Sequence, residues 1–316
     1  MLNKTSDIPY GGLNADKIRN AKPKFHPEHL EMFKQFVVDR YLVHLNKDYY
    51  KQPKPWTNNR ILQNYKFTNV RREHDKTTIF LLDMLEQHKD DTFYNKVMNI
   101  ILFRLFNKIE TSQLLGWVDF SQYDDTTVRA KLSRATPGFI YFTNAFYTTG
   151  MRQGFKKYYP DETFHPLIIP RAVAHLSNDV FQDICEARCP QDVIEALKTF
   201  NGIGDFLSYQ MFVDLTYLPE FPWSENEFVV SGPGCIAGLS ELFEDRGGLN
   251  YDELLFWLRD NCPITPEMCS QLMVDLPEHD RHMNIMSLEN CMCELSKYIR
   301  AMEGKGRPKN LYNGLV

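Results

Sequence analysis

The stretch "LKTFNGIGDFLSYQMFVDL" (residues 197–215) sets a Gly-Ile-Gly turn between two apolar segments with helical spacing. Glycine adopts backbone angles closed to other residues and lets a partner approach the main chain, while Ile203 is expected to fix the turn to the core. Gly204 precedes a helix, whose free N–H groups and positive dipole end favour phosphate. The stretch predicts a helix-hairpin-helix with Gly202, Ile203 and Gly204 on a DNA backbone. The alternative is an ordinary glycine-capped turn between two helices.

Length and composition exclude several classes of protein. The chain has 316 residues, 43% of them hydrophobic, which is enough to bury a sizeable core. It contains neither an apolar run long enough to cross a membrane nor a signal peptide, so we expect an intracellular protein. That means the cytoplasm of an infected host if a bacteriophage encodes the chain, or the nucleus if it is eukaryotic. The seven cysteines lack metal-ligand spacing, so we expect thiols, no metal and no cofactor.

Charge is unevenly distributed along the chain. The net charge of -5 argues against a protein that coats nucleic acid non-specifically. Residues 47–76 nevertheless hold eight Lys/Arg against three Asp/Glu, whereas residues 224–260 hold eight Asp/Glu against two Arg. A chain of this kind can bind a polyanion and still perform carboxylate chemistry, although ordinary surface variation would look the same.

Helical periodicity recurs through most of the chain, with no βαβ alternation, hairpin series or internal repeat. We expect a mostly α fold, with residues 1–25 as a flexible arm and 26–316 as one helical domain whose lobes, if there are two, divide near 120–190. The expected helices cover residues 26–46, 60–65, 75–87, 95–106, 171–176, 180–187, 190–200, 206–215, 235–243, 251–261, 266–276 and 286–302. The aromatic stretch at 137–150 fits either a strand or a helix.

An acidic loop follows the predicted hairpin. In helix-hairpin-helix DNA glycosylases a catalytic carboxylate lies about twenty residues after the hairpin, and here Glu225 and Glu227 occupy that offset. Gly232 and Gly234, in "SGPG", form a second glycine turn before a helix and are also candidates for the DNA backbone. A carboxylate beside such a turn could deprotonate a nucleophile or stabilise a developing cation. A solvated acidic loop is the alternative.

Other polar residues recur with suggestive spacing. Trp56, in "PWTNN", could stack on an unpaired base or be a core residue. In "KFTNVRREHD", Arg72 could bind a phosphate with Glu73 holding it in place. Further candidates are three residues expected on one helical face and a pair four residues apart that could read a base edge: Arg104, Asn107 and Glu110, then Gln210 and Asp214.

Five blocks in order carry a resemblance to a known family. They are "PWTNNRILQNYKFTNVRREHDKTT", "ILFRLFNKIETSQLLG", "FNGIGDFLSYQMFVDLTY", "ENEFVVSGPGCIAGL" and "LENCMCELSKYIRAMEGKGRP". Between about residues 36 and 312 the chain resembles the helical domain found with phage 5-hydroxymethyluracil DNA kinases and the related alpha-glutamyl/putrescinyl thymine pyrophosphorylase clade. The resemblance implies a helix-hairpin-helix, DNA-glycosylase-like helical bundle. Its pattern adds Thr57 and Asn69 to the substrate residues and supports Gln210 and Asp214.

The resemblance also implies a role in thymine hypermodification. These 316 residues contain no G-x-x-x-x-G-K-[ST] motif, so we do not expect P-loop phosphorylation from them. We expect an enzyme that displaces the phosphate of an activated 5-hydroxymethyluracil in DNA with an amine or amino acid, a separate kinase supplying the activated base. One alternative is a glycosylase that removes a modified base, and another is a non-catalytic binder of modified DNA. Positions 225 and 227 carry Glu, whereas many relatives are expected to carry Asp in this block.

Overall fold

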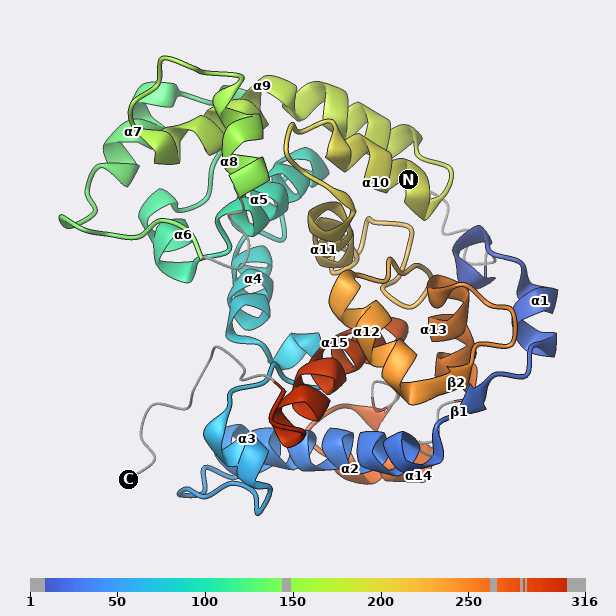
Figure 1. Cartoon of the computed structure of the whole chain (residues 1–316). Helices are drawn as coiled ribbons and strands as arrows, with labels where there is room; N and C mark the ends of the chain where they lie inside the picture. The colour runs from blue at the N-terminus through green and yellow to red at the C-terminus, as the bar shows by residue number, and fades with distance from the viewer. Residues whose placement is uncertain (1–8, 144–148, 262–265, 279–280, 282, 306–316) are drawn as a thin grey trace. The chain divides into compact units, whose positions relative to one another are not determined.

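The computed structural model describes residues 9–143, 149–261, 266–278, 281 and 283–305 (Figure 1). Helices dominate these residues and strands occupy two short segments, which confirms the mostly α prediction. Within the described ranges, no helix is both long enough and apolar enough to traverse a bilayer.

The chain forms two compact units. Unit 1 comprises residues 1–11 and 76–225, and unit 2 comprises residues 12–75 and 226–316. Unit 2 is therefore assembled from two segments that are distant in the sequence. The boundaries fall at 75/76 and 225/226 rather than near 120–190, because the segment expected to divide the chain packs into the helices of unit 1.

Unit 1 is built around α5. Its described helices are α4 (Lys76–Gln87), α5 (Phe93–Phe106), α6 (Ile109–Leu115), η4 (Phe120–Gln122), α7 (Asp125–Leu132), α8 (Thr149–Lys156), α9 (His165–Glu186), α10 (Pro190–Lys198) and α11 (Asp205–Leu215). Every residue of α5 from 95 to 106 is buried, and α4, α6, α9 and α11 contact this helix. The Thr92 hydroxyl caps its first turn. Such an apolar segment is stable only when other helices surround it.

Two features of unit 1 differ from the sequence expectations. The segments at 171–176 and 180–187 form one continuous helix, α9, in which the Ser177 hydroxyl donates to the carbonyl of Ala174. This local hydrogen bond satisfies the serine side chain within the helix, so the polar residues 177–179 between the two expected segments remain helical. In the aromatic stretch at 137–150, residues 137–143 are neither helix nor strand, α8 begins at Thr149, and residues 144–148 lie outside the described residues.

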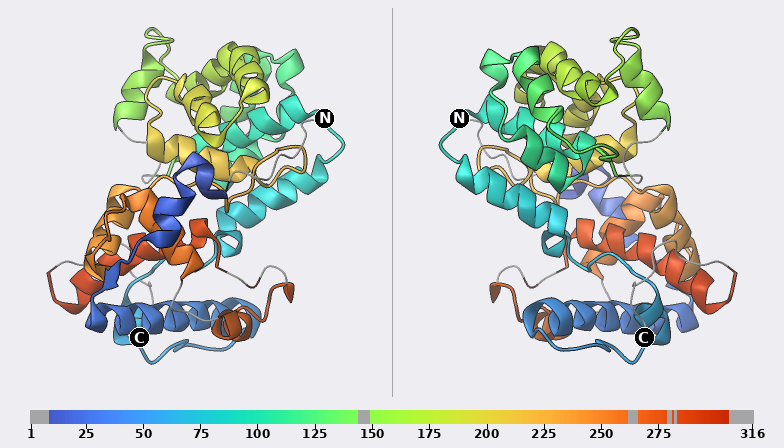
Figure 2. Two further views of the ribbon diagram at one scale, coloured as in Figure 1. Left: turned by 90° about the vertical axis from the view of Figure 1, so that its right-hand side faces the viewer. Right: turned by 90° about the vertical axis from the view of Figure 1, so that its left-hand side faces the viewer.

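Unit 2 joins segments from both ends of the chain. Its elements are η1 (Pro9–Gly12) at the boundary, α1 (Ala15–Asn20), β1 (Lys24–Phe25), α2 (Pro27–His44), the π-helix η2 (Leu45–Tyr49), α3 (Arg60–Asn64), η3 (Arg72–His74), α12 (Pro233–Leu242), β2 (Phe243–Asp245), α13 (Tyr251–Asp260), α14 (Pro266–Leu272) and α15 (Ile285–Met302). Helix α14 packs beside α2 (Figure 2).

Close packing of α12 on α15 forms the centre of unit 2. A Cβ atom added at Gly238 in α12 would lie closer than 3.0 Å to the backbone of Met292 in α15, so only glycine permits this approach. Strands β1 and β2 pair antiparallel, and the rings of Phe25 and Phe243 stack with centroids 4.6 Å apart. The pairing attaches the N-terminal segment to the C-terminal helices.

The expected flexible arm is partly folded. Residues 15–20 form α1, in which Ile18 is buried, and Lys17 makes an ion pair with Glu253 of α13 at 2.5 Å. Asn14 caps this helix by accepting from the amide of Lys17. The expectation was wrong for this part of the arm because a single buried isoleucine in a six-residue helix leaves little periodicity to detect. Residues 1–8 lie outside the described part.

Candidate functional site

The Gly-Ile-Gly turn has the predicted form of a hairpin between α10 and α11. Gly202 has a φ of 89°, a left-handed conformation that favours glycine, and Gly204 is the N-cap of α11. Both glycines are exposed, whereas Ile203 is buried and anchors the turn. The main chain around Gly204 therefore faces solvent at a helix N-terminus, where backbone N–H groups attract anions.

Helix α8 holds the hairpin in place. A Cβ atom at Gly154 would lie closer than 3.0 Å to the Asn201 backbone, so α8 contacts the turn directly. The Tyr158 hydroxyl accepts from the Asn201 amide at 3.0 Å and donates to the carbonyl of Thr199 at 3.2 Å. Lys156 and Lys157, between these contacts, are exposed. Unit 1 thus presents cationic side chains on the segment that supports the glycine turn.

One acidic residue opposes anion binding at this turn. Asp205 is the first residue of α11, where its carboxylate would compete with a phosphate for the amides of the first turn. Its Oδ1 instead lies 2.9 Å from Nζ of Lys198, which largely offsets the charge. The neighbouring Phe206 is 47% exposed and presents an aromatic ring beside the hairpin.

Arg104 and Asp214 form a buried ion pair inside unit 1. Nε of Arg104 donates to Oδ2 of Asp214 at 2.5 Å and Nη2 donates to Oδ1 at 2.8 Å. Their exposures are 3% and 0%, so both groups lie in the core of unit 1. Gln210, one turn earlier on α11, is buried as well. The structure thus places these three residues in the core rather than on a surface, because α5 and α11 carry complementary charges that the spacing did not reveal. Their role in substrate binding and catalysis stays a prediction.

The polar face expected along residues 104–110 does not exist. Helix α5 ends at Phe106, Asn107 is a left-handed C-cap with a φ of 48°, and Glu110 lies in the first turn of α6. The Asn107 side chain accepts from Nη1 of Arg104 at 2.8 Å and donates to the Thr143 hydroxyl at 3.2 Å. Glu110 is exposed, so these three residues do not line one surface.

Trp56 lies in the wall of a pocket in unit 2 and is not a core residue. The pocket has a volume of about 600 Å³. The side chains that line it come from α2 and the following loop: Gln35, Asp39, Leu42, Asn46, Pro55, Trp56, Thr57, Asn58 and Asn59. Such a volume suits a small ligand. Ammonium groups of Lys47 and Lys54 lie 5.8 and 5.0 Å from the indole centroid.

Hydrogen bonds orient the carboxylate in this pocket. Oδ1 of Asp39 accepts from Gln35 at 2.7 Å, and Oδ2 accepts from Nδ2 of Asn59 at 3.0 Å. The same Asn59 nitrogen donates to the hydroxyl of Tyr298 on α15 at 2.9 Å. Each carboxylate oxygen keeps a lone pair, so Asp39 can accept a proton or bind an ammonium group.

The arginine cluster of "KFTNVRREHD" is arranged differently from the expectation. Glu73 pairs with Arg71 at 2.8 Å and not with Arg72. Arg72 is 5% exposed and its charge acts on Glu289, a buried carboxyl of α15. Asn69 donates to the carbonyl of His74 at 2.7 Å, so it supports the backbone of η3. The sequence alone could not show which of the two adjacent arginines faces Glu73, because that depends on the local backbone conformation.

The second glycine turn meets the same buried carboxyl. The Gly232 amide donates to Glu289, and a Cβ atom at Gly234 would lie 3.3 Å from Sγ of Cys293. Burial raises the pKa of Glu289 to about 7, although the Cys293 thiol, the Gly232 amide and Arg72 all lower it. The Gly232 amide thus already has an acceptor inside unit 2, and contact of this turn with a DNA backbone stays a prediction.

The acidic-loop residues Glu225 and Glu227 are half-buried and lie in a turn before residues 228–232. Glu225 ends unit 1, and Glu227 belongs to unit 2. Their catalytic role stays a prediction. Cys185, Cys189, Cys235, Cys291 and Cys293 are free thiols, and burial raises the pKa of Cys235 and Cys293. These two thiols are therefore protonated and poorly reactive at neutral pH.

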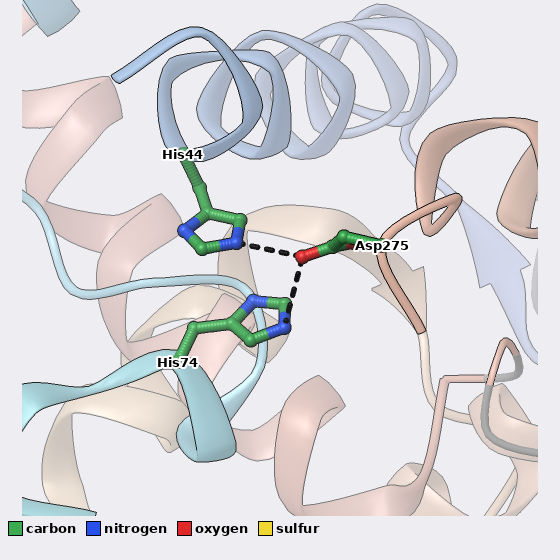
Figure 3. Close-up of side chains that lie close together, drawn as sticks. All are labelled: His44, His74 and Asp275. Carbon is green, nitrogen blue, oxygen red and sulfur yellow. Dashed lines mark hydrogen bonds and ion pairs between the residues drawn. The ribbon is translucent and has the colours of Figure 1, made fainter. Parts of the chain in front are cut away.

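A cluster that the sequence analysis missed joins His44, His74 and Asp275 (Figure 3). Nε2 of His44 lies 2.8 Å from Oδ2 of Asp275, and Nε2 of His74 lies 3.4 Å from the same oxygen. Burial, and after it the nearby His44, lower the pKa of His74 to about 4. The residues come from the end of α2, from η3 and from the turn after α14. No spacing in the sequence could identify them, because the third ligand is about 200 residues away.

Comparison with known proteins agrees with the blocks identified in the sequence. Residues 27–307 match the family described as "5-hmdU DNA kinase, helical domain". A protein of Bacillus phage SP10, named "5-hmdU DNA kinase", is 24% identical over 282 residues, which are 83% of this chain and 43% of that protein. The chain thus spans less than half the length of this relative. No solved structure matches the chain. The family match covers both units, and the chain belongs to the 5-hmdU DNA kinase helical-domain family.

Proposed function

We propose that this chain modifies a base in DNA. Its substrate is a 5-hydroxymethyluracil-derived base carrying a phosphate or pyrophosphate, and its reaction replaces that group with an amine or amino acid. The family match supports the link to 5-hydroxymethyluracil. The hairpin of unit 1 and the pocket of unit 2 supply two features that such an enzyme requires, a contact for the DNA backbone and a cavity for a reacting group.

The hairpin supports contact with the DNA backbone. Exposed Gly202 and Gly204 allow close approach to the main chain at the start of α11, and Lys156 and Lys157 stand on the adjoining segment. Backbone amides and lysines bind phosphate regardless of base sequence. This surface therefore positions DNA and leaves recognition of the modified base to other residues.

The pocket beside Trp56 is the single observation that carries the proposal. An indole can stack on an extruded base, and stacking contributes roughly 1–3 kcal/mol per base. Lys47 and Lys54 put positive charge next to that ring, where a phosphate on the base would bind. Asp39 supplies a carboxylate for the incoming amine. The pocket thus combines an aromatic surface, an anion-binding edge and a base.

The reaction balances with these groups. The C–O bond between the 5-methylene carbon and the phosphate breaks, and the electron pair leaves with the phosphate. The amine nitrogen forms a bond to the same carbon, and its excess proton passes to the Asp39 carboxylate or to water. The lysines stabilise the leaving phosphate as its negative charge grows.

Nucleoside mass spectrometry distinguishes the three functions considered. Oligonucleotides containing 5-hydroxymethyluracil, its phosphate or its pyrophosphate are incubated with the chain and a panel of amines and amino acids. A new thymine adduct formed only from an activated base supports the proposal. Release of the free base would mean a glycosylase, and unchanged nucleosides despite DNA binding would mean a non-catalytic binder.

Matched variants test the pocket. Asp39→Asn and Trp56→Ala are expected to lower adduct formation at least tenfold, with Trp56→Phe retaining most of it. Lys54→Ala should weaken binding of the activated substrate. Lys66 is an exposed lysine of the same unit, and Lys66→Ala should leave this binding unchanged. Loss of activity in Glu225→Gln or Glu227→Gln, with Asp39→Asn fully active, would move the chemistry from the pocket to the acidic loop.

A further inference from the structure

We propose that His44, His74 and Asp275 bind one divalent transition-metal ion, of which zinc is the representative. The cluster lies within unit 2 and does not depend on the proposed DNA chemistry (Figure 3). Two imidazoles and one carboxylate are a ligand set common to zinc, iron and manganese sites. Two observations support the site: the ligand atoms converge, and the buried His74 ring makes no hydrogen bond to the described residues.

The three side chains converge in a protected place. One ligand atom of each residue lies within 4.8 Å of the other two, and the exposed fractions of the side chains are 9%, 9% and 7%. The imidazole rings stack with centroids 3.9 Å apart and planes 11° apart, and both direct Nε2 toward the carboxylate. Ligands of a tetrahedral zinc ion with ~2.0–2.1 Å bonds lie about 3.3 Å apart, so a modest rotation of the rings completes the geometry.

His74 provides the observation that points to a ligand. Its side chain is 91% buried, and its Nε2 lies within ion-pair distance of Asp275 Oδ2 at 3.4 Å. Neither Nδ1 nor Nε2 makes a hydrogen bond to the described residues, however. A buried neutral imidazole with no hydrogen bond costs free energy, because both its donor and its acceptor lose water. A metal ion bound to Nε2 removes most of this cost.

Two neighbouring side chains, Asp48 and Tyr41, contact the ligand residues. Nδ1 of His44 lies 3.4 Å from Oδ2 of Asp48 without forming a hydrogen bond, so a small rotation of the ring would let it donate to this carboxylate. The Tyr41 hydroxyl donates to Oδ1 of Asp275, which leaves Oδ2 directed at the two histidines. A carboxylate behind a ligating histidine is the usual arrangement in protein zinc sites.

Binding would join three segments of unit 2. His44 ends α2, His74 lies in η3, and Asp275 follows α14, so one ion would link two segments from the N-terminal half to the C-terminal half. The side chains are too buried for a substrate-accessible centre. A structural role is therefore expected, in which metal raises the melting temperature.

The test uses the full chain without a histidine tag, stripped with a chelator and dialysed. Calorimetric titration with Zn²⁺ should show one site per chain and metal analysis one equivalent of zinc. The melting temperature should rise by several degrees with Zn²⁺ and fall again when chelator is added. His74→Gln and Asp275→Asn should each weaken zinc binding at least 100-fold.

A second histidine pair in unit 2 provides the matched control. His26 and His29 also stack, with centroids 4.2 Å apart, and His29 lies 3.7 Å from the Glu241 carboxylate, but these residues do not converge as a ligand set. His29→Gln should bind zinc like the wild type. Equal binding by His74→Gln and the wild type, or loss in His29→Gln alone, would overturn the proposal.

Spectroscopy of the wild type keeps the test valid if a variant does not fold. Co²⁺ should give visible d–d bands without thiolate charge transfer, since no cysteine belongs to the cluster. X-ray absorption at the zinc edge should report two imidazoles and no sulfur. Sulfur ligation, or the absence of stoichiometric binding, would refute the assignment.

Discussion

Removing one member of the Arg104–Asp214 pair should destabilise unit 1 strongly. The guanidinium makes two hydrogen bonds to the carboxylate and a third to Asn107, and the pair is 3% and 0% exposed. In Arg104→Met the Asp214 carboxylate would remain charged in a site that water cannot reach. Breaking a buried pair in this way costs about 3–5 kcal/mol. For a unit of this size the melting temperature would fall by roughly 10 °C.

Replacing both residues by apolar ones removes the unpaired charge. Arg104→Met combined with Asp214→Leu should recover most of the stability lost in either single variant, giving a coupling free energy of about 3 kcal/mol. Urea unfolding followed by circular dichroism measures this cycle. Arg129→Met serves as the control, because the Arg129 side chain is 42% exposed and its ion pair with Glu162 should contribute under about 1 kcal/mol.

The pair also separates a structural role from phosphate binding. If Arg104 held a phosphate, Arg104→Met would keep the wild-type stability and lose affinity for DNA or pyrophosphate. That result would refute the reasoning, because the Arg104 side chain is 3% exposed and three of its five N–H donors already bond to Asp214 and Asn107. The buried-pair interpretation instead requires loss of stability and, in the double variant, restored stability with unchanged affinity.

Three further perturbations follow from the packing and the charges. Burial raises the pKa of Glu289 from 4.5 to about 7, so the folded state favours the protonated carboxyl. The contribution of Glu289 to the free energy of unfolding is therefore fully present below pH 4.5 and is lost as the pH rises through 7. Glu289→Gln should therefore gain about 3 kcal/mol over the wild type between pH 5 and pH 8, measured by urea unfolding, and an unchanged difference would contradict the raised pKa. Gly238→Ala should lower the melting temperature of unit 2, because the added methyl overlaps the backbone of Met292; an equal or higher value would show that α12 can move away. Charge reversal of Lys156 and Lys157 should weaken DNA binding tenfold or more at low salt and flatten its salt dependence, whereas unchanged affinity in a fluorescence titration would remove this segment from the DNA interface.

Local signals in the sequence predicted much of the helical structure. The periodic segment at 26–46 is α2 with an end two residues earlier, and the glycine hairpin begins α11 one residue before the expected start. Such elements depend on residues near one another in the chain, namely an apolar stripe, a proline in the first turn and a glycine cap. Short helices such as α1 and α6 were missed because fewer than eight residues carry little periodicity.

Partners distant in the sequence could not be predicted in the same way. Arg104 and Asp214 are 110 residues apart, and each alone resembles a polar residue lining a site. Only the packing of α5 on α11 shows that they neutralise one another. A residue within one of the family blocks can therefore serve to stabilise the fold rather than to perform catalysis.

A polar side chain therefore becomes a site candidate when its partners leave part of its bonding capacity facing a cavity. Arg104 fails this criterion because the side chain is 3% exposed and its three hydrogen bonds to Asp214 and Asn107 lie inside the core. Asp39 meets it, since each oxygen accepts one amide hydrogen and the carboxylate still lines a pocket of about 600 Å³. The block that contains Trp56 borders the same pocket. The loop after α2, rather than the helices around α5, therefore brings together an aromatic ring, positive charge and a carboxylate.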